Sequence, residues 1–180
     1  MKRLIRRVAI LALLMVTAKP GLGQQPAGPT VYRSIEVAIF SVGGAFSSVG
    51  ALPEDYRILL ETELVKRLGR LKGCELVARE SSHAELPAPA LRLVGTFTKF
   101  KPGSRLKRSL GVPGVGSTIV EAHVQFLDRS SSAVLAEGDV RGRLLATPSP
   151  LVNTTRSSLE AVGDLAYYVV QIARKRFFHS

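Results

Sequence analysis

Residues 118–127, TIVEAHVQFL, carry the pattern that most restricts what this chain can fold into. The apolar set is Val120, Ala122, Val124 and Phe126, and the polar set is Glu121, His123 and Gln125. This alternation places apolar side chains on one face of an extended strand and polar side chains on the other. One wet face is typical of antiparallel sheets. The sequence therefore predicts a sheet with one face against a core and the other in water.

Two further strand candidates flank this segment. Leu91–Lys101 precedes it, and Val134–Leu145 follows it after the polar turn DRSSS at residues 128–132. A short turn rich in Asp and Ser favours antiparallel neighbours. The three segments are thus predicted to form an antiparallel meander. In the last of them, the side chains expected to face the core are those of Val134, Ala136 and Val140.

The N-terminal half predicts a strand, a helix and another strand. Ile35–Phe40 and Glu75–Ala78 are short apolar runs, and Ser41–Leu52 is a small, glycine-containing loop. The Pro-Glu-Asp sequence at 53–55 suits the first turn of a helix, which we expect Gly73 to stop. This order favours a parallel strand pair with a right-handed crossover. The apolar stripe of the helix is Tyr56, Leu59, Leu60, Leu64, Leu68 and Leu71.

A second helix closes the chain. It ends in the basic run at 174–176, which suits the negative end of a helix dipole. Its apolar stripe is Leu159, Val162, Ala166, Val169 and Ala173. The predicted fold class is therefore α+β, an α/β sandwich. It has a mixed five-stranded sheet in the chain order β-α-β-β-β-α, strands three to five form the meander, and two helices pack on the sheet.

The N-terminus has the parts of a secretory signal. A basic start is followed by the short apolar run Val8–Ala18 and by small residues up to Gly23. The apolar run is shorter than the roughly 20 residues that a membrane-spanning helix needs. We predict a signal peptide at 1–23, a flexible lead-in at 24–32 and a single globular domain at 33–178. Cleavage after Ala18, or an uncleaved N-terminal anchor, is the alternative.

The predicted location is periplasmic or secreted, with no transmembrane span in the mature chain. The only cysteine is Cys74, which we expect to be a small buried strand residue, so there is neither an internal disulfide nor a lipid-attachment cysteine after the apolar run. Residues 1–23 hold five of the 25 Lys and Arg and none of the 14 Asp and Glu, so their removal lowers the formal charge from +11 to +6. Nucleic acid is not an expected partner.

The segment GVPGVGST at 111–118 has the glycine spacing of a phosphate-binding loop. Such a loop needs a lysine that reaches the terminal phosphates and a helix whose N-terminus faces the anion. Here Ser117 occupies the lysine position, Pro113 lacks an amide, and an alternating strand follows. The glycines are therefore interpreted as structural. The predicted structural hairpin glycines are Gly95, Gly103, Gly111, Gly114 and Gly116.

Five cations within ten residues form the strongest candidate site. They are Lys99, Lys101, Arg105, Lys107 and Arg108. A concentration of positive charge attracts anionic surfaces. The predicted partners are anionic envelope lipid, lipopolysaccharide or another envelope protein. The alternative is an ordinary solvated hairpin, or charges that guard a sheet edge.

Other chemistry receives little support. The three histidines, at 83, 123 and 179, lack metal-ligand spacing, so we predict no metal site, no cofactor and no catalytic residue. A hydrolase that uses His123 and Asp128 remains an alternative, because catalytic groups can assemble from distant positions. A nucleotide- or anion-binding domain is the other alternative.

Residues 95–136 also resemble a known family. The motif GTFTKF at 95–100 is followed by Gly103-Ser104-Arg105, and later by Asp128 and Val134-Leu135-Ala136. Between them stand Arg108, Gly111, Gly114 and Gly116. Together they resemble the central signature of a bacterial exported family, domain of unknown function 4410. Ser131-Ser132 replaces the usual Thr-Gly turn, and Pro113 is unusual.

That resemblance implies a fold and a location, and no activity. The family's domain is similar in layout to the periplasmic α/β domain of curli-secretion lipoproteins, which implies a role in the cell envelope by analogy. The function expected is a non-enzymatic binding or assembly protein associated with the envelope.

Overall fold

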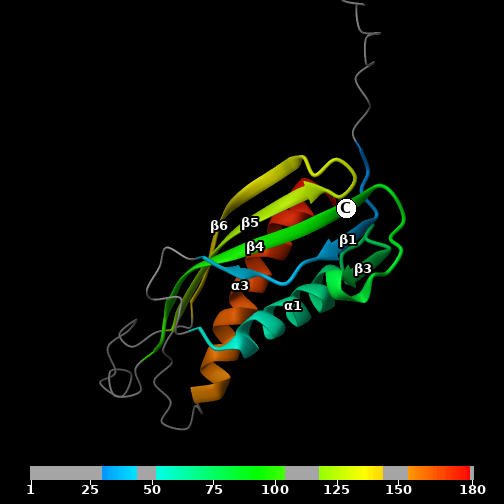
Figure 1. Ribbon diagram of the computed structural model, residues 1–180. Coiled ribbons are helices and arrows are strands. Elements are labelled where there is room, and N and C mark those ends of the chain that lie inside the picture. Colours follow the sequence, from blue (N-terminus) through cyan, green and yellow to red (C-terminus); the bar gives the residue numbers. More distant parts are fainter. Residues whose placement is uncertain (1–29, 44–51, 104–117, 144–153, 179–180) are drawn as a thin grey trace, which may run out of the picture.

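The computed structural model describes residues 30–43, 52–103, 118–143 and 154–178, without the side chains of 154–159. The predicted signal peptide and most of the lead-in lie outside these residues. Two helices lie on one face of a single sheet (Figure 1). The strands are β1 (Ser34–Val37), β2 (Ser41–Val42), β3 (Leu76–Arg79), β4 (Ala90–Lys101), β5 (Ile119–Asp128) and β6 (Val134–Arg143). The helices are α1 (Glu54–Leu68) and α3 (Thr154–Arg176), and a short 3-10 turn spans Glu80–Ser82.

The sheet has the order β3-β1-β4-β5-β6, and β2 also pairs with β4. Strand β1 is parallel to both β3 and β4, while β4, β5 and β6 are antiparallel. The predicted α+β class, the parallel pair and the meander are therefore confirmed. Strand β2 was not predicted: Ser41–Val42 lies in the segment interpreted as a loop and pairs in parallel with Thr96 and Phe97.

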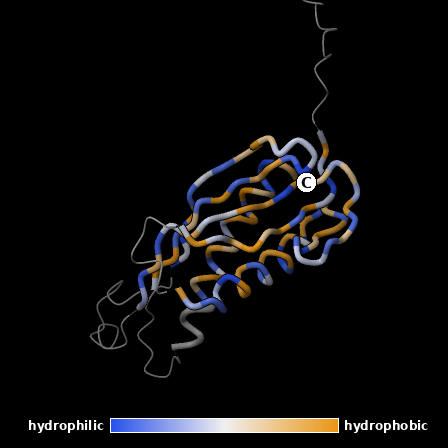
Figure 2. Tube along the Cα trace, viewed as in Figure 1, coloured by the Kyte–Doolittle hydropathy of each residue, from blue (hydrophilic) through white to orange (hydrophobic). Residues whose placement is uncertain are grey.

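The core lies between the helices and the inner face of the sheet, hereafter the core face. Alternate residues of β5, from Val120 to Phe126, are fully buried, and Leu91 and Leu93 of β4 lie beside them. The helices add two apolar stripes to this core. Figure 2 shows apolar and polar residues following one another along the helices and strands. The predicted helix stripes are confirmed in Leu60, Leu64 and Leu68 of α1 and in Val162, Ala166, Val169 and Ala173 of α3.

Strand β4 has an irregularity at Thr98. The register with β5 shifts between Phe97 and Lys99, as in a β-bulge. Both Phe97 and Phe100 are consequently buried, although they stand three residues apart in a strand. The bulge keeps the second half of β4 in contact with the core.

Two glycines allow close packing on the core face. A Cβ atom at Gly95 would lie 2.3 Å from the Phe40 ring, and one at Gly142 would lie 2.1 Å from the backbone oxygen of Ala161 in α3. Gly95 was predicted to be a hairpin glycine, and it lies within β4 instead. Gly103 lies at the base of the predicted hairpin, where its amide donates to Thr118 Oγ1 at 3.2 Å. Gly111, Gly114 and Gly116 lie outside the described residues.

Three sequence-based expectations need correction. Helix α1 ends at Leu68 with Gly69 as its C-cap, and Gly73 lies in the following turn with a positive φ of 87°. Cys74 is half-buried and precedes β3 instead of lying within it. Val134 is exposed, because the register between β5 and β6 shifts between Phe126 and Leu127 and turns the start of β6 away from the core.

Candidate functional site

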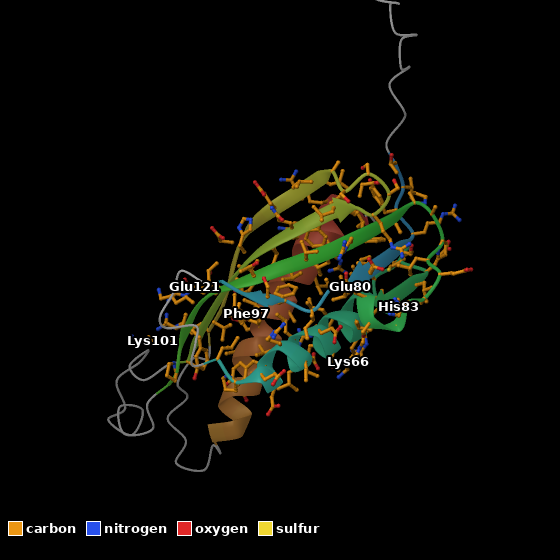
Figure 3. All side chains as sticks on the ribbon, in the orientation of Figure 1. Lys66, Glu80, His83, Phe97, Lys101 and Glu121 are labelled. Atoms are coloured by element: carbon orange, nitrogen blue, oxygen red, sulfur yellow. The ribbon has the colours of Figure 1, made fainter. Side chains whose placement is uncertain are left out.

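The face of the sheet turned away from the helices, hereafter the open face, carries most of the candidate groups. No described helix or strand covers it, and polar side chains of β4, β5 and β6 lie across it (Figure 3). Lys99 and Lys101 stand near the end of β4, and Lys101 is exposed. The other predicted cations, Arg105, Lys107 and Arg108, lie outside the described residues. The structure therefore places two of the five.

Lys99 is not a free charge on this face. Its Nζ lies 3.6 Å from Glu121 Oε1, and Arg141 Nε of β6 lies 3.4 Å from the same oxygen. Register explains the group, since Glu121 stands opposite Lys99 on one side and Arg141 on the other. One carboxylate thus partly neutralises two cations. Sequence reasoning missed this pairing because it depends on the strand register.

A second group follows along β5. His123 Nδ1 lies 2.9 Å from Asp139 Oδ1, and His123 Nε2 lies 3.7 Å from Glu137 Oε2. Gln125 Nε2 donates to Glu137 Oε2 at 3.0 Å. His123 therefore lies on the solvent-facing side of β5, as predicted, and two carboxylates of β6 surround it.

A third group lies around Glu36 of β1, whose side chain is only 12% exposed. Arg129 Nη2 lies 3.2 Å from one Glu36 oxygen, and Arg92 Nε lies 3.6 Å from the other. Arg92 also donates through Nη2 to Glu80. Neither arginine was among the predicted site residues. A signal was present, because Arg92 interrupts an otherwise apolar strand start.

A shallow hollow of about 260 Å³ separates the second and third groups. Its polar lining consists of Ser41, Glu80, Arg92, Thr96, His123 and Gln125. Carboxylates and cations in it are already bound to one another, as described above. The hollow therefore offers hydrogen-bonding groups rather than an uncompensated charge.

Asp128 serves the turn between β5 and β6. It accepts hydrogen bonds from the amides of Ser130 and Ser131 at 3.0 and 2.8 Å, from both serine hydroxyls, and from the Tyr32 hydroxyl at 3.1 Å. These hydrogen bonds hold the pKa of the Asp128 carboxyl well below its ordinary value, and the bond from the Ser130 hydroxyl has the largest effect. Burial, followed by the bond to Asp128, raises the pKa of Tyr32.

The hydrolase alternative receives no support from this geometry. His123 and Asp128 stand five residues apart in one strand, so their side chains point to opposite faces. Burial raises the pKa of the Cys74 thiol to about 11, which leaves little thiolate to act as a nucleophile at neutral pH. Within the described ranges, no cluster of three or more His, Cys, Asp and Glu could hold a metal ion.

The segment after Ser117 is strand β5, as predicted from its alternation. A helix N-terminus, which a phosphate-binding loop of the Walker type requires, is therefore not present at this position. Among the helices described here, none is both long and apolar enough to cross a membrane.

Comparisons with known proteins agree with this architecture. A family model described as "Domain of unknown function (DUF4410)" matches residues 48–148. None of the curated proteins shows significant sequence similarity to the chain.

Two solved structures illustrate the fold. The PelC dodecamer from Paraburkholderia phytofirmans is 12% identical, with a TM-score of 0.50, and the match covers 77% of this chain and 91% of that chain. Protein XCC0632 from Xanthomonas campestris, of the family DUF330, is 16% identical, with a TM-score of 0.53, and the match covers 85% of this chain and 88% of that chain. At these identities the likeness concerns the fold alone.

Proposed function

The chain belongs to the DUF4410 family, and we propose that it is an exported, non-enzymatic binding and assembly protein of the bacterial cell envelope. Export is supported by the basic and apolar N-terminus, residues 1–23. A non-enzymatic role is supported by the open face, where the charged groups pair with one another. The pKa values of catalytic groups are often shifted by charges in their surroundings that are not fully paired. The shifts described above have other causes: the hydrogen bonds of a turn at Asp128, and burial at Tyr32 and Cys74.

The observation that carries the binding proposal is the position of Lys99 and Lys101. Both lie at the end of β4 that leads into the basic segment 102–117. Because Glu121 partly neutralises Lys99, the effective charge comes from Lys101 together with Arg105, Lys107 and Arg108. We propose that these cations, hereafter the basic hairpin, bind anionic lipid or lipopolysaccharide.

The assembly part of the proposal rests on a structural neighbour. PelC, which shares this fold, was solved as a dodecamer. We propose that the present chain also forms assemblies of its own copies, which would multiply the number of basic hairpins that face one anionic surface. Several weak contacts in one assembly bind far more tightly than one.

Vesicle binding tests the basic hairpin. Reversal of Arg105, Lys107 and Arg108 to glutamate in the chain 24–180 should weaken binding to vesicles with anionic lipid by about a hundredfold or more, since each cation near such a surface contributes about 1 kcal/mol. Sedimentation with vesicles at two salt concentrations measures this loss. Vesicles of zwitterionic lipid should bind neither the wild type nor the triple glutamate variant.

A matched control reverses three exposed cations elsewhere: Arg70, Lys72 and Arg174. It changes the net charge equally, at the opposite end of the sheet from Lys101. It should therefore retain most of the binding, and circular dichroism checks that both triple variants fold. Equal losses in the two variants would show that net charge alone governs binding and would refute the basic hairpin as a site.

A further inference from the structure

The outer edge of β6 is the strongest feature that the basic hairpin does not use. β6 pairs with β5 along its length, and within the described ranges no strand lies on its other side (Figure 1). The amide of Arg143 donates to Asp164 Oδ2 of α3 at 3.0 Å. This amide therefore points away from β5. Because backbone groups alternate in direction along a strand, residues 137, 139 and 141 also present theirs outward.

These same residues carry a simple charge pattern. Glu137 and Asp139 are acidic, Arg141 and Arg143 are basic, and all four are exposed on the open face. The strand thus has an acidic first half and a basic second half. In an antiparallel pair of identical strands, the first half of one copy lies against the second half of the other. Such a pattern is self-complementary.

We propose that β6 pairs with β6 of a second copy of this chain, antiparallel and about a two-fold axis at Val140. In this register Glu137 lies opposite Arg143 of the second copy, and Asp139 lies opposite Arg141. Both pairs occur twice by symmetry, as in any isologous interface. The Asp139–Arg141 pairs can also exchange main-chain hydrogen bonds, because both are outward backbone positions. At the Glu137–Arg143 pairs the Arg143 amide is already bonded to Asp164, so the contact there comes from the side-chain charges. The two sheets become one continuous sheet.

The other registers bring like charges together. An axis at Gly138 places Glu137 opposite Asp139, and an axis at Gly142 places Arg141 opposite Arg143. Axes at Asp139 or Arg141 place that residue opposite its own copy. Like charges directly opposite each other destabilise a strand pair. The Val140 register alone among these joins only opposite charges.

Helix α3 supplies an apolar contact beside this edge. Asp164 reaches the outward amide of Arg143, so its side of α3 faces the edge. Tyr168 follows four residues later on the same side of the helix and is 47% exposed. Pairing about Val140 brings the α3 helices of the two copies toward each other. Exposed aromatic side chains of this kind are enriched in protein interfaces.

Charged residues on an edge strand usually prevent pairing with other chains. Here they would select the partner, because a strand with any other charge order meets repulsion. This inference deepens the assembly part of the proposed function and rests on it. It does not depend on binding to anionic surfaces.

Charge exchange tests the register. Glu137→Arg places arginine opposite Arg143, and Arg143→Glu places glutamate opposite Glu137, so each variant alone carries two repulsive pairs. In an equimolar mixture, a heterodimer of the two variants restores both opposite-charge pairs. Sedimentation velocity of the chain 24–180 should show self-association of the wild type, about a tenfold loss in each variant, and recovery to within about threefold in the mixture.

Each outcome decides a different point. A wild type that is monomeric at every concentration would overturn both the inference and the assembly part of the proposed function, while vesicle binding would be measured separately. Variants that associate like the wild type, or a mixture that does not recover, would overturn the β6 pairing alone. If a variant fails to fold, the pairing is tested instead by amide hydrogen exchange of the wild type at several protein concentrations. The amides of Asp139 and Arg141 should exchange more slowly as concentration rises, and exchange independent of concentration would overturn the pairing.

Discussion

Gly142 and Glu121 lie on opposite faces of the same strand pair, and they differ in how much room surrounds them. On the core face, a Cβ at Gly142 would meet the backbone of α3 at 2.1 Å. On the open face, the Glu121 carboxylate pairs at 3.4 and 3.6 Å with cations whose side chains are about half exposed. Packed backbones cannot yield, whereas exposed ion pairs exchange readily with water. The fold therefore depends on the core face, and the open face can change with little effect on stability.

Gly142→Ala should have the largest effect on stability. The added methyl group meets backbone atoms of Ala161 and Leu165, so α3 must move, at a cost of about 3 kcal/mol in the free energy of unfolding. Gly138→Ala is the matched control in the same strand, because no atom lies within 4 Å of the position that its methyl group would take. It should change the free energy by less than about 1 kcal/mol. Urea denaturation measures both, and equal losses would contradict the packing argument.

Asp128→Asn should have an intermediate and pH-dependent effect. The hydrogen bonds from Ser130 and Ser131 lower the pKa of Asp128 in the folded state. Its ionised form therefore stabilises the fold above the ordinary pKa of about 4, and this stabilisation is lost as the pH falls toward the lowered folded value. The wild type should have a higher melting temperature than the variant at pH 7, and the difference should shrink below about pH 4.

Glu85→Gln controls for the loss of one exposed carboxylate outside the turn. Its melting temperature should follow that of the wild type across the same pH series. A difference between Asp128→Asn and wild type that stays constant from pH 7 to acid would show that ionisation of Asp128 is not its cause.

Glu121→Gln should have the smallest effect. It weakens two exposed ion pairs and should lower the free energy of unfolding by about 1 kcal/mol or less, with a smaller loss at high salt. Urea denaturation at low and high salt provides the measurement. A loss as large as that of Gly142→Ala would remove the contrast between the two faces.

The sequence predicted the parts of the fold that depend on local pattern. Alternation in residues 118–127 identified β5 and its buried face, and apolar stripes identified both helices. The bulge at Thr98 was missed, although Phe97 and Phe100 stand three residues apart and so break the alternation. The exposed position of Val134 could not be predicted, because it follows from a register shift against β5.

The candidate site was less accessible to prediction. Clustering of positive charge identified Lys99 and Lys101, but the pairing of Lys99 with Glu121 depends on which residues face each other across two strands. The arginine pair around Glu36 joins residues 56 and 93 positions apart. No short sequence pattern spans separations of 56 or 93 residues. The proposed roles of Arg105, Lys107 and Arg108 remain predictions.

The position of β1 between β3 and β4 has a consequence for how the chain folds. Ser34 pairs with Leu76 and with Ala90, which follow 42 and 56 residues later. The strands of the meander, by contrast, are consecutive in the chain, and contacts between segments distant in sequence require the closure of larger loops. In the export proposed for this chain, with the N-terminus leading, β1 would therefore emerge before either of its neighbours. Its apolar residues Ile35 and Val37 would lack both partner strands until β3 emerges, and the second partner until β4 emerges.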